Sequence, residues 1–166
     1  MSVPPQTSKK YKLVAVGGTF DHFHKGHESL LTKAFSIGER ILIGVTTDSF
    51  CASKPLSNVI QPFELRKRSV INFIREHFKD VDFQIIDLSD KYGPTVYEKN
   101  IEAIVVTEDT FKTALEINQI RVSRGLQPLE IVLVDMVLAY DGLPISSTRV
   151  RRGEITVDGE PAHLKK

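Results

Sequence analysis

The feature that most constrains the fold of this chain is a regular alternation of short apolar runs with segments of helical periodicity. The apolar runs predict strands over residues 11–16, 40–46, 82–88, 101–106 and 129–137. Apolar residues at helical spacing, or a cap before an amphipathic stretch, predict helices over residues 25–37, 62–78, 109–125 and 146–153. Because the strands are continuously apolar, we expect an α/β fold: a Rossmann-like, five-stranded parallel sheet with helices on both faces.

The bulk properties bound the organisation and the compartment. The 166 residues suffice for one domain, predicted over residues 11–155, with a flexible N-terminal tail over 1–10 and a C-terminal tail over 156–166. A net charge of +1 argues against a basic nucleic-acid-binding surface. No apolar run approaches the roughly 18 residues of a membrane span, and the N-terminus lacks a secretory signal. With one cysteine, Cys51, we expect a cytoplasmic protein without nucleic-acid or membrane partners.

The stretch "GGTFDHFHKGHESLL", residues 17–31, crowds glycines and histidines between the first predicted strand and helix. In open parallel sheets, ligands bind beyond the carboxyl ends of the strands, where the strand order reverses. Three interpretations compete at this position: a metal held by His22, His24 and His27, a plain turn, or a nucleotide site. A metal is disfavoured because no cysteine lies nearby and the zinc pattern H-E-x-x-H is absent. His22 alone is interpreted as a turn residue.

The nucleotide interpretation accounts for more of these residues at once. Gly17 and Gly18 lack a Cβ, so phosphate oxygens can approach their backbone amides. The N-terminus of the following helix favours an anion, and a base lying against Gly26 would explain a glycine in its first turn. His24 and His27 are three residues apart and can point their N–H groups toward one phosphate. The sequence contains neither a Walker loop nor the dinucleotide G-x-G-x-x-G.

A second motif, "ISSTRVR" over residues 145–151, places three hydroxyls before a short cationic helix. Ser146 or Ser147 makes a natural N-cap, and taken alone this segment needs no further explanation. Paired with "HKGH", it resembles the nucleotidylyltransferase superfamily. The further segments "SKPLSNVIQPFELR", "DKYGPT", "VVTEDT" and "INQIR" resemble the pantetheine-phosphate adenylyltransferase family, in the archaeal branch that is similar to half of eukaryotic coenzyme A synthase.

This resemblance implies the nucleotidylyltransferase fold and a reversible transfer of an adenylyl group from ATP to 4′-phosphopantetheine. The products would be dephospho-coenzyme A and pyrophosphate, and Mg²⁺ would arrive with ATP. The acceptor is already an ionised phosphate, so no general base is needed, and catalysis rests on positioning and charge stabilisation. The alternatives are another member of the superfamily, with FMN, nicotinamide mononucleotide or a cytidylyl acceptor, and a nucleotide-binding module without turnover.

The resemblance also implies residue roles. His27 is expected at the α-phosphate, His24 at neighbouring phosphates, and Thr19 between the α-phosphate and the acceptor phosphate. Lys54 is expected to hold the acceptor phosphate or the charge between the two phosphates. Arg121, three residues after Asn118 on a predicted helix, either faces the substrate with it or occupies an ordinary surface position. The β- and γ-phosphates are assigned to Ser146, Ser147, Thr148 and Arg151.

Neighbouring residues are given structural roles. Asp21 is interpreted as a turn residue in preference to one that orients the histidines, and Arg149 and Arg152 are interpreted as solvent-facing. The bacterial branch carries T-x-G-H where this chain has His24, and an arginine-rich loop where it has residues 107–109. Contacts from that bacterial loop therefore do not transfer. No residue is assigned to a metal, and the sequence does not predict the oligomeric state.

Overall fold

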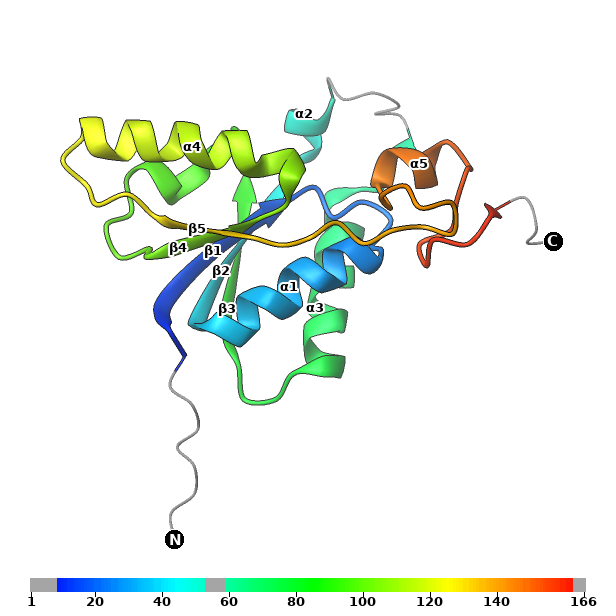
Figure 1. Ribbon diagram of the computed structural model, residues 1–166, viewed down its shortest axis with the longest axis horizontal. Helices are drawn as coiled ribbons and strands as arrows, with labels where there is room; N and C mark the ends of the chain where they lie inside the picture. Colours follow the sequence, from blue (N-terminus) through cyan, green and yellow to red (C-terminus); the bar gives the residue numbers. More distant parts are fainter. Residues whose placement is uncertain (1–8, 53–58, 163–166) are drawn as a thin grey trace, which may run out of the picture.

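The computed structural model describes residues 9–52 and 59–162. Five strands form a single sheet: β1 (Tyr11–Gly18), β2 (Gly38–Thr46), β3 (Asp82–Leu88), β4 (Ala103–Val106) and β5 (Glu130–Leu133). The helices are α1 (Lys25–Ile37), α2 (Asp48–Cys51), α3 (Phe63–His77), the 3₁₀ helix η2 (Gly93–Val96), α4 (Glu108–Ser123) and α5 (Ser147–Arg151). Figure 1 shows their arrangement around the sheet.

All strand pairs are parallel, and the sheet order is β3-β2-β1-β4-β5. The order therefore reverses between β1 and β4. These two strands pair over only two registered positions, Val14 with Ala103 and Ala15 with Ile104, whereas β1 and β2 pair along their whole length. A crevice at the carboxyl end of β1 follows from this divergence.

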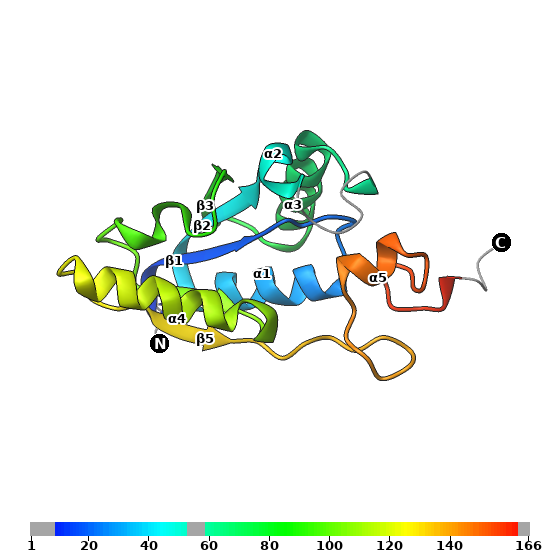
Figure 2. The same cartoon turned by 90° about the horizontal axis from the view of Figure 1, so that it is seen from above.

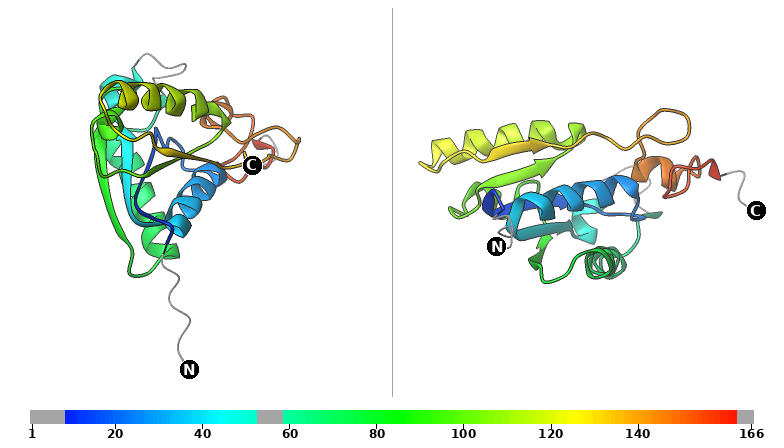
Figure 3. Two further views of the ribbon diagram at one scale, coloured as in Figure 1. Left: turned by 60° about the vertical axis from the view of Figure 1, so that its left-hand side comes forward. Right: turned by 60° about the horizontal axis from the view of Figure 1, so that its bottom comes forward.

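Two apolar layers cover the sheet, with α1 and α3 on one face and α4 on the other (Figures 1 and 3). The strands contribute alternate residues to the two layers: Val14 and Val16 pack toward α1, and Ala15 packs toward α4. The α1 side is larger and includes Leu31, Phe35 and the α3 residues that pack beneath β2 and β3. The predicted Rossmann-like five-stranded α/β fold with helices on both faces is confirmed.

Some boundaries and faces differ from the predictions. β5 ends at Leu133 rather than at residue 137. The N–H of Val134 still donates to the carbonyl of Val106 at 2.8 Å, but the chain beyond it leaves the sheet, and Val134 and Val137 pack on apolar clusters. The stretch after β2, where no helix is predicted, contains α2, which Thr47 caps through its hydroxyl. On α3, Leu65 is exposed, although it is one of the apolar residues on which the helix over residues 62–78 is predicted. Arg66 is fully buried in its place.

The C-terminal segment is more ordered than predicted. Residues 156–162 lie within the folded unit rather than in a tail. The N–H of Lys25, at the start of α1, donates to the carbonyl of Val157 at 3.2 Å, and the N–H of Tyr140 donates to Gly159 at 2.8 Å. Ile155 and Gly159 are buried, and a β-bridge joins Ile155 to Pro161. Figure 2 shows this segment beside α5, near the N-terminal end of α1.

Candidate active site

The first corner of the site is the N-terminus of α1, where two histidines form a reciprocal cap. The Nδ1 of His24 accepts from the N–H of Gly26 at 3.1 Å, and the Nδ1 of His27 accepts from the N–H of His24 at 3.1 Å. The two rings stack, with centroids 3.7 Å apart and planes inclined by 20°. Because each Nδ1 is an acceptor, each neutral ring carries its proton on Nε2. The pair therefore presents two Nε2–H donors.

Both imidazoles are held in the neutral form. Burial lowers the pKa of His24 from its ordinary 6.5 to about 4; Asp21 opposes this shift and His22 adds to it. Burial, with a smaller contribution from His24, also moves the pKa of His27 well below its usual value. The His27 ring lies 5.2 Å from Phe20 and 5.3 Å from Phe23, centroid to centroid. At neutral pH these histidines act as hydrogen-bond donors rather than as cations.

The structure gives Gly26 a different explanation from the predicted stacking of a base. A Cβ at this position would lie 2.9 Å from Cε1 and 3.1 Å from Nδ1 of His24. The missing side chain therefore makes room for the His24 ring, which is itself the helix cap.

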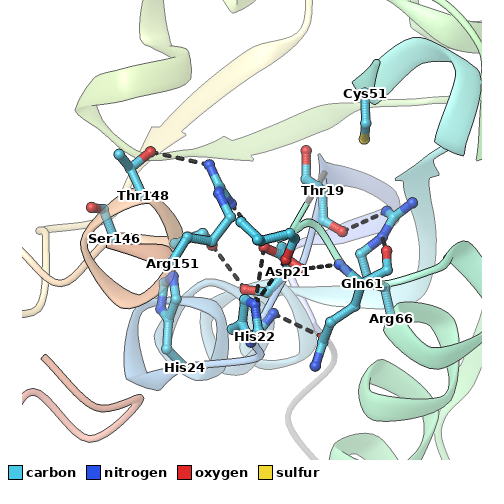
Figure 4. Close-up of polar contacts among 12 residues, drawn as sticks. Thr19, Asp21, His22, His24, Cys51, Gln61, Arg66, Ser146, Thr148 and Arg151 are labelled. Carbon is cyan, nitrogen blue, oxygen red and sulfur yellow. Dashed lines mark hydrogen bonds and ion pairs between the residues drawn. The ribbon is translucent and has the colours of Figure 1, made fainter. Parts of the chain in front are cut away.

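The second corner, α5, meets the first through direct contacts across more than a hundred residues of sequence (Figure 4). The hydroxyl of Ser147 donates to the backbone carbonyl of Asp21 at 2.9 Å. Nη1 of Arg151 donates to Oδ2 of Asp21 at 2.8 Å, and both side chains are buried. A Cβ built on Gly26 would also lie 3.9 Å from the carbonyl oxygen of Ile145. Residues 24–27 and 146–151, the two segments expected to bind phosphates, therefore lie at one rim of the sheet.

The three hydroxyls of the second motif have different surroundings. Ser146 caps α5 by accepting from the N–H of Arg149, and Thr148 accepts from Nη2 of Arg151. Both keep their proton for another acceptor. Ser147 has given its only proton to Asp21, so in this arrangement it docks α5 rather than serving as a donor to a phosphate. With five residues, α5 is also too short for its dipole to add much.

Two sequence interpretations at this corner were wrong. Asp21 is more than a turn residue: it is fully buried and is bound by Arg151 and by the N–H of Gln61 at 2.8 Å. Arg149 does not face solvent, because its side chain is 15% exposed and forms ion pairs with Asp141 and Glu154. Arg152 is exposed, as predicted.

A buried arginine that the sequence analysis missed ties together the ends of β1 and β2. Nη1 of Arg66 donates to the carbonyls of Thr19 at 2.9 Å and Thr46 at 2.8 Å, and its Nε donates to the carbonyl of Gln61 at 2.7 Å. The Thr46 hydroxyl donates to the hydroxyl of Thr19 at 3.1 Å, which leaves the Thr19 proton for another acceptor. A cationic residue within an otherwise apolar stripe of α3 is the signal that could have revealed Arg66.

A cavity of about 440 Å³ opens from Thr19 on the α4 face of the sheet. Gly17, Gly18 and Thr19 line one side. The rest of the wall is mostly apolar and comes from the ends of β2, β3 and β4, from α4, and from η2 together with Lys91 and Tyr92, which precede it. Lys91 and the Tyr92 hydroxyl both bind Glu116 on α4, at 2.8 and 2.9 Å. The volume falls in the range of small-molecule sites.

The prediction that Arg121 faces the substrate was wrong. Arg121 is 1% exposed, and its guanidinium donates to the backbone carbonyls of Thr95, Glu98 and Gln127 at 2.7–2.9 Å. Burial lowers its pKa. Asn118 likewise binds backbone, exchanging two hydrogen bonds with Leu129. Both residues hold the loops around α4 in place.

Lys54 lies outside the described residues, so its role stays a prediction. Over residues 9–52 and 59–162, no three His, Cys, Asp or Glu side chains gather as a metal-binding group. In the same part of the chain, no helix is long and apolar enough to cross a membrane.

Together, the sheet order, the neutral imidazole pair, the hydroxyls and Arg151 at one rim form the arrangement expected of a nucleotidyltransferase. The model of the cytidylyltransferase-like family matches residues 15–153. The phosphopantetheine adenylyltransferase of Methanothermobacter thermautotrophicus is 52% identical over 147 residues, which cover 89% of this chain and 87% of that protein. The corresponding enzyme of Methanopyrus kandleri is 45% identical over 146 residues, covering 88% and 92%.

A crystal structure of a protein of unknown function from Archaeoglobus fulgidus has a TM-score of 0.67 at 34% identity, covering 74% of this chain and 88% of that one. The chain belongs to the cytidylyltransferase-like family, among relatives that are phosphopantetheine adenylyltransferases. The family predicted from the paired motifs is confirmed.

Proposed function

We propose that this protein transfers an adenylyl group from ATP to 4′-phosphopantetheine, giving dephospho-coenzyme A and pyrophosphate. The observation that carries the proposal is the meeting of the two motifs at the carboxyl end of β1. Ser147 and Arg151 bind Asp21, three residues before His24, next to a cavity that begins at Thr19. The motifs place phosphate-binding groups on one side of Thr19, and the cavity offers space for an acceptor on the other.

In the proposed reaction, a phosphate oxygen of the acceptor attacks the α-phosphorus of ATP in line with the departing pyrophosphate. The new bond joins that oxygen to the α-phosphorus, and the bond to the bridging oxygen of pyrophosphate breaks with its electron pair. The attacking group is already ionised, so no side chain needs to remove a proton. Preorganised donors aimed at the charge that develops are worth about 3–4 kcal/mol each.

The chain's own residues fit this requirement. His27 would donate from Nε2 to the α-phosphate, and His24 to a neighbouring phosphate. Because burial lowers the pKa values of both histidines, both rings are neutral Nε2–H donors before the nucleotide binds. Thr19 would bridge the α-phosphate and the acceptor phosphate, because its own proton remains available. Ser146, Thr148 and Arg151 would hold the β- and γ-phosphates, and the amides of Gly17 and Gly18 would line the approach.

The cavity beyond Thr19 would take the pantetheine arm. Its apolar wall from Ile86, Leu88 and Ile104 suits the aliphatic part of such a chain. Lys91 and Tyr92 at its rim would face the distal, amide-bearing part. Mg²⁺ is treated as part of the MgATP substrate, because Asp21, the carboxylate between the two corners, is committed to Arg151 and Gln61. A cytoplasmic location matches the reaction proposed.

The test is release of pyrophosphate from ATP with and without 4′-phosphopantetheine. We expect release only with this acceptor. CTP in place of ATP, and FMN, nicotinamide mononucleotide or glycerol phosphate in place of phosphopantetheine, provide the matched controls. Release that is faster with any of these than with ATP and phosphopantetheine would contradict the assignment, and tight ATP binding without release for any acceptor would favour a non-catalytic module.

A further inference from the structure

We propose that Asp21 is a positioning residue that sets the guanidinium of Arg151 for the phosphates of ATP. The inference rests on the proposed function in that Arg151 is taken to bind the triphosphate. Asp21 itself is not expected to touch the nucleotide. Its effect would pass through Arg151.

The contacts of Asp21 divide it between the two halves of the site. Oδ2 accepts from Nη1 of Arg151 at 2.8 Å, and Oδ1 accepts from the N–H of Gln61 at 2.8 Å. Its backbone carbonyl accepts from the Ser147 hydroxyl at 2.9 Å. Gln61 in turn accepts Nε of Arg66 on its carbonyl. A chain of hydrogen bonds therefore begins at Arg66, which also binds the carbonyls of Thr19 and Thr46. It runs through Gln61 and Asp21 to Arg151 on α5 (Figure 4).

The backbone around Asp21 is shaped to bury this carboxylate. Phe20 and His22, on either side of it, have positive φ values of 54° and 46°, which side-chain-bearing residues rarely adopt. Such residues are strained and persist where the surroundings require them. Here Phe20 is buried in the core and the Asp21 side chain is fully buried. The N–H of His22 donates to Oε1 of Gln61 at 3.0 Å.

Arg151 shows the feature that points to a ligand. Nη1 is bound to Asp21 and Nη2 to Thr148, and the side chain is 5% exposed. Its Nε is the one buried side-chain nitrogen or oxygen without a hydrogen-bond partner in the described part of the chain. Buried donors are almost always satisfied, so this N–H is the group that a phosphate oxygen would complete. The contact with Asp21 fixes the direction in which it points.

The experiment is a double-mutant cycle on ATP binding, measured by calorimetry in the absence of acceptor. The variants are Asp21→Asn, Arg151→Gln and the two together. We expect each single change to weaken ATP binding about tenfold or more, as for loss of a charge-assisted hydrogen bond. The double variant should bind no more than about twofold more weakly than Arg151→Gln, because Asp21 acts through Arg151. Losses that multiply, or an Asp21→Asn variant that binds normally, would overturn the inference.

Controls separate positioning from stability. Asn118→Ala removes two backbone contacts on α4, away from both corners, and should lower stability without changing ATP affinity. If Asp21→Asn does not fold, Arg151→Lys carries the test: it keeps a cation beside Asp21 but cannot serve Asp21, Thr148 and a phosphate together. It should bind ATP as weakly as Arg151→Gln, and wild-type affinity would contradict the inference. If the wild-type protein binds ATP but releases no pyrophosphate with phosphopantetheine, only the proposed reaction is refuted.

Discussion

The neutral state of His24 makes the stability of this protein sensitive to acid. Its pKa is about 4 in the folded chain and 6.5 in the unfolded chain, so the folded state takes up its proton later as the pH falls. A depressed pKa contributes stability that is fully present above pH 6.5 and is lost as the pH falls toward 4. Between neutral pH and about pH 4.5, the loss from this one ring amounts to about 2 kcal/mol.

His24→Asn isolates this effect, because asparagine is a good N-cap and does not titrate. Urea denaturation at a series of pH values should give a wild-type free energy of unfolding that falls more steeply below pH 6.5 than that of the variant. The difference between the two curves should grow by about 2 kcal/mol by about pH 4.5. His27 adds a loss of the same sign in both proteins. Parallel curves for the two proteins would refute the assignment of a buried, neutral His24.

Three further predictions follow from single contacts. His27→Ala should lower kcat by roughly a hundredfold or more while weakening ATP binding far less, because the donor acts on charge that develops in the transition state. Pyrophosphate release and calorimetry measure the two effects, and equal losses would make the role of His27 one of ground-state binding. Gly26→Ala would place a Cβ 2.9 Å from Cε1 of His24, so activity should fall because the ring must shift. Thermal stability should change little, since alanine favours the helix. Unchanged kcat/KM would show that the position of the His24 ring is not needed. Arg121→Met leaves the carbonyls of Thr95, Glu98 and Gln127 without their donor and should destabilise the chain by about 3 kcal/mol in urea denaturation; unaltered stability would contradict its structural role.

The parts of the fold that could be predicted are those that local patterns encode. The run from Tyr11 to Gly18 and the helix that begins at Lys25 follow from continuous apolarity and helical spacing within a few residues. The same holds for the site's two motifs, since each is a short segment at a strand-to-helix corner. Their meeting on one rim follows from the carboxyl ends of parallel strands sharing an edge.

The parts that could not be predicted depend on side chains that meet across the fold. Asp21 and Arg151 are 130 residues apart, and nothing near either residue indicates the partner. Arg121 resembled a substrate contact because a helix places it near Asn118, yet its carbonyl partners lie in loops whose paths the sequence does not specify. Val134 and Val137 extend the apolar run of β5, but burial outside a sheet produces the same pattern as burial inside it.

The central claim is that the first and last strand-to-helix corners hold one triphosphate. A crystal structure with a non-hydrolysable ATP analogue tests this most directly. We predict the α-phosphate within hydrogen-bond distance of Nε2 of His27, and the β- and γ-phosphates against Thr148 and Nε of Arg151. Phosphates bound by residues 24–27 alone, or a nucleotide seated away from β1, would contradict the account.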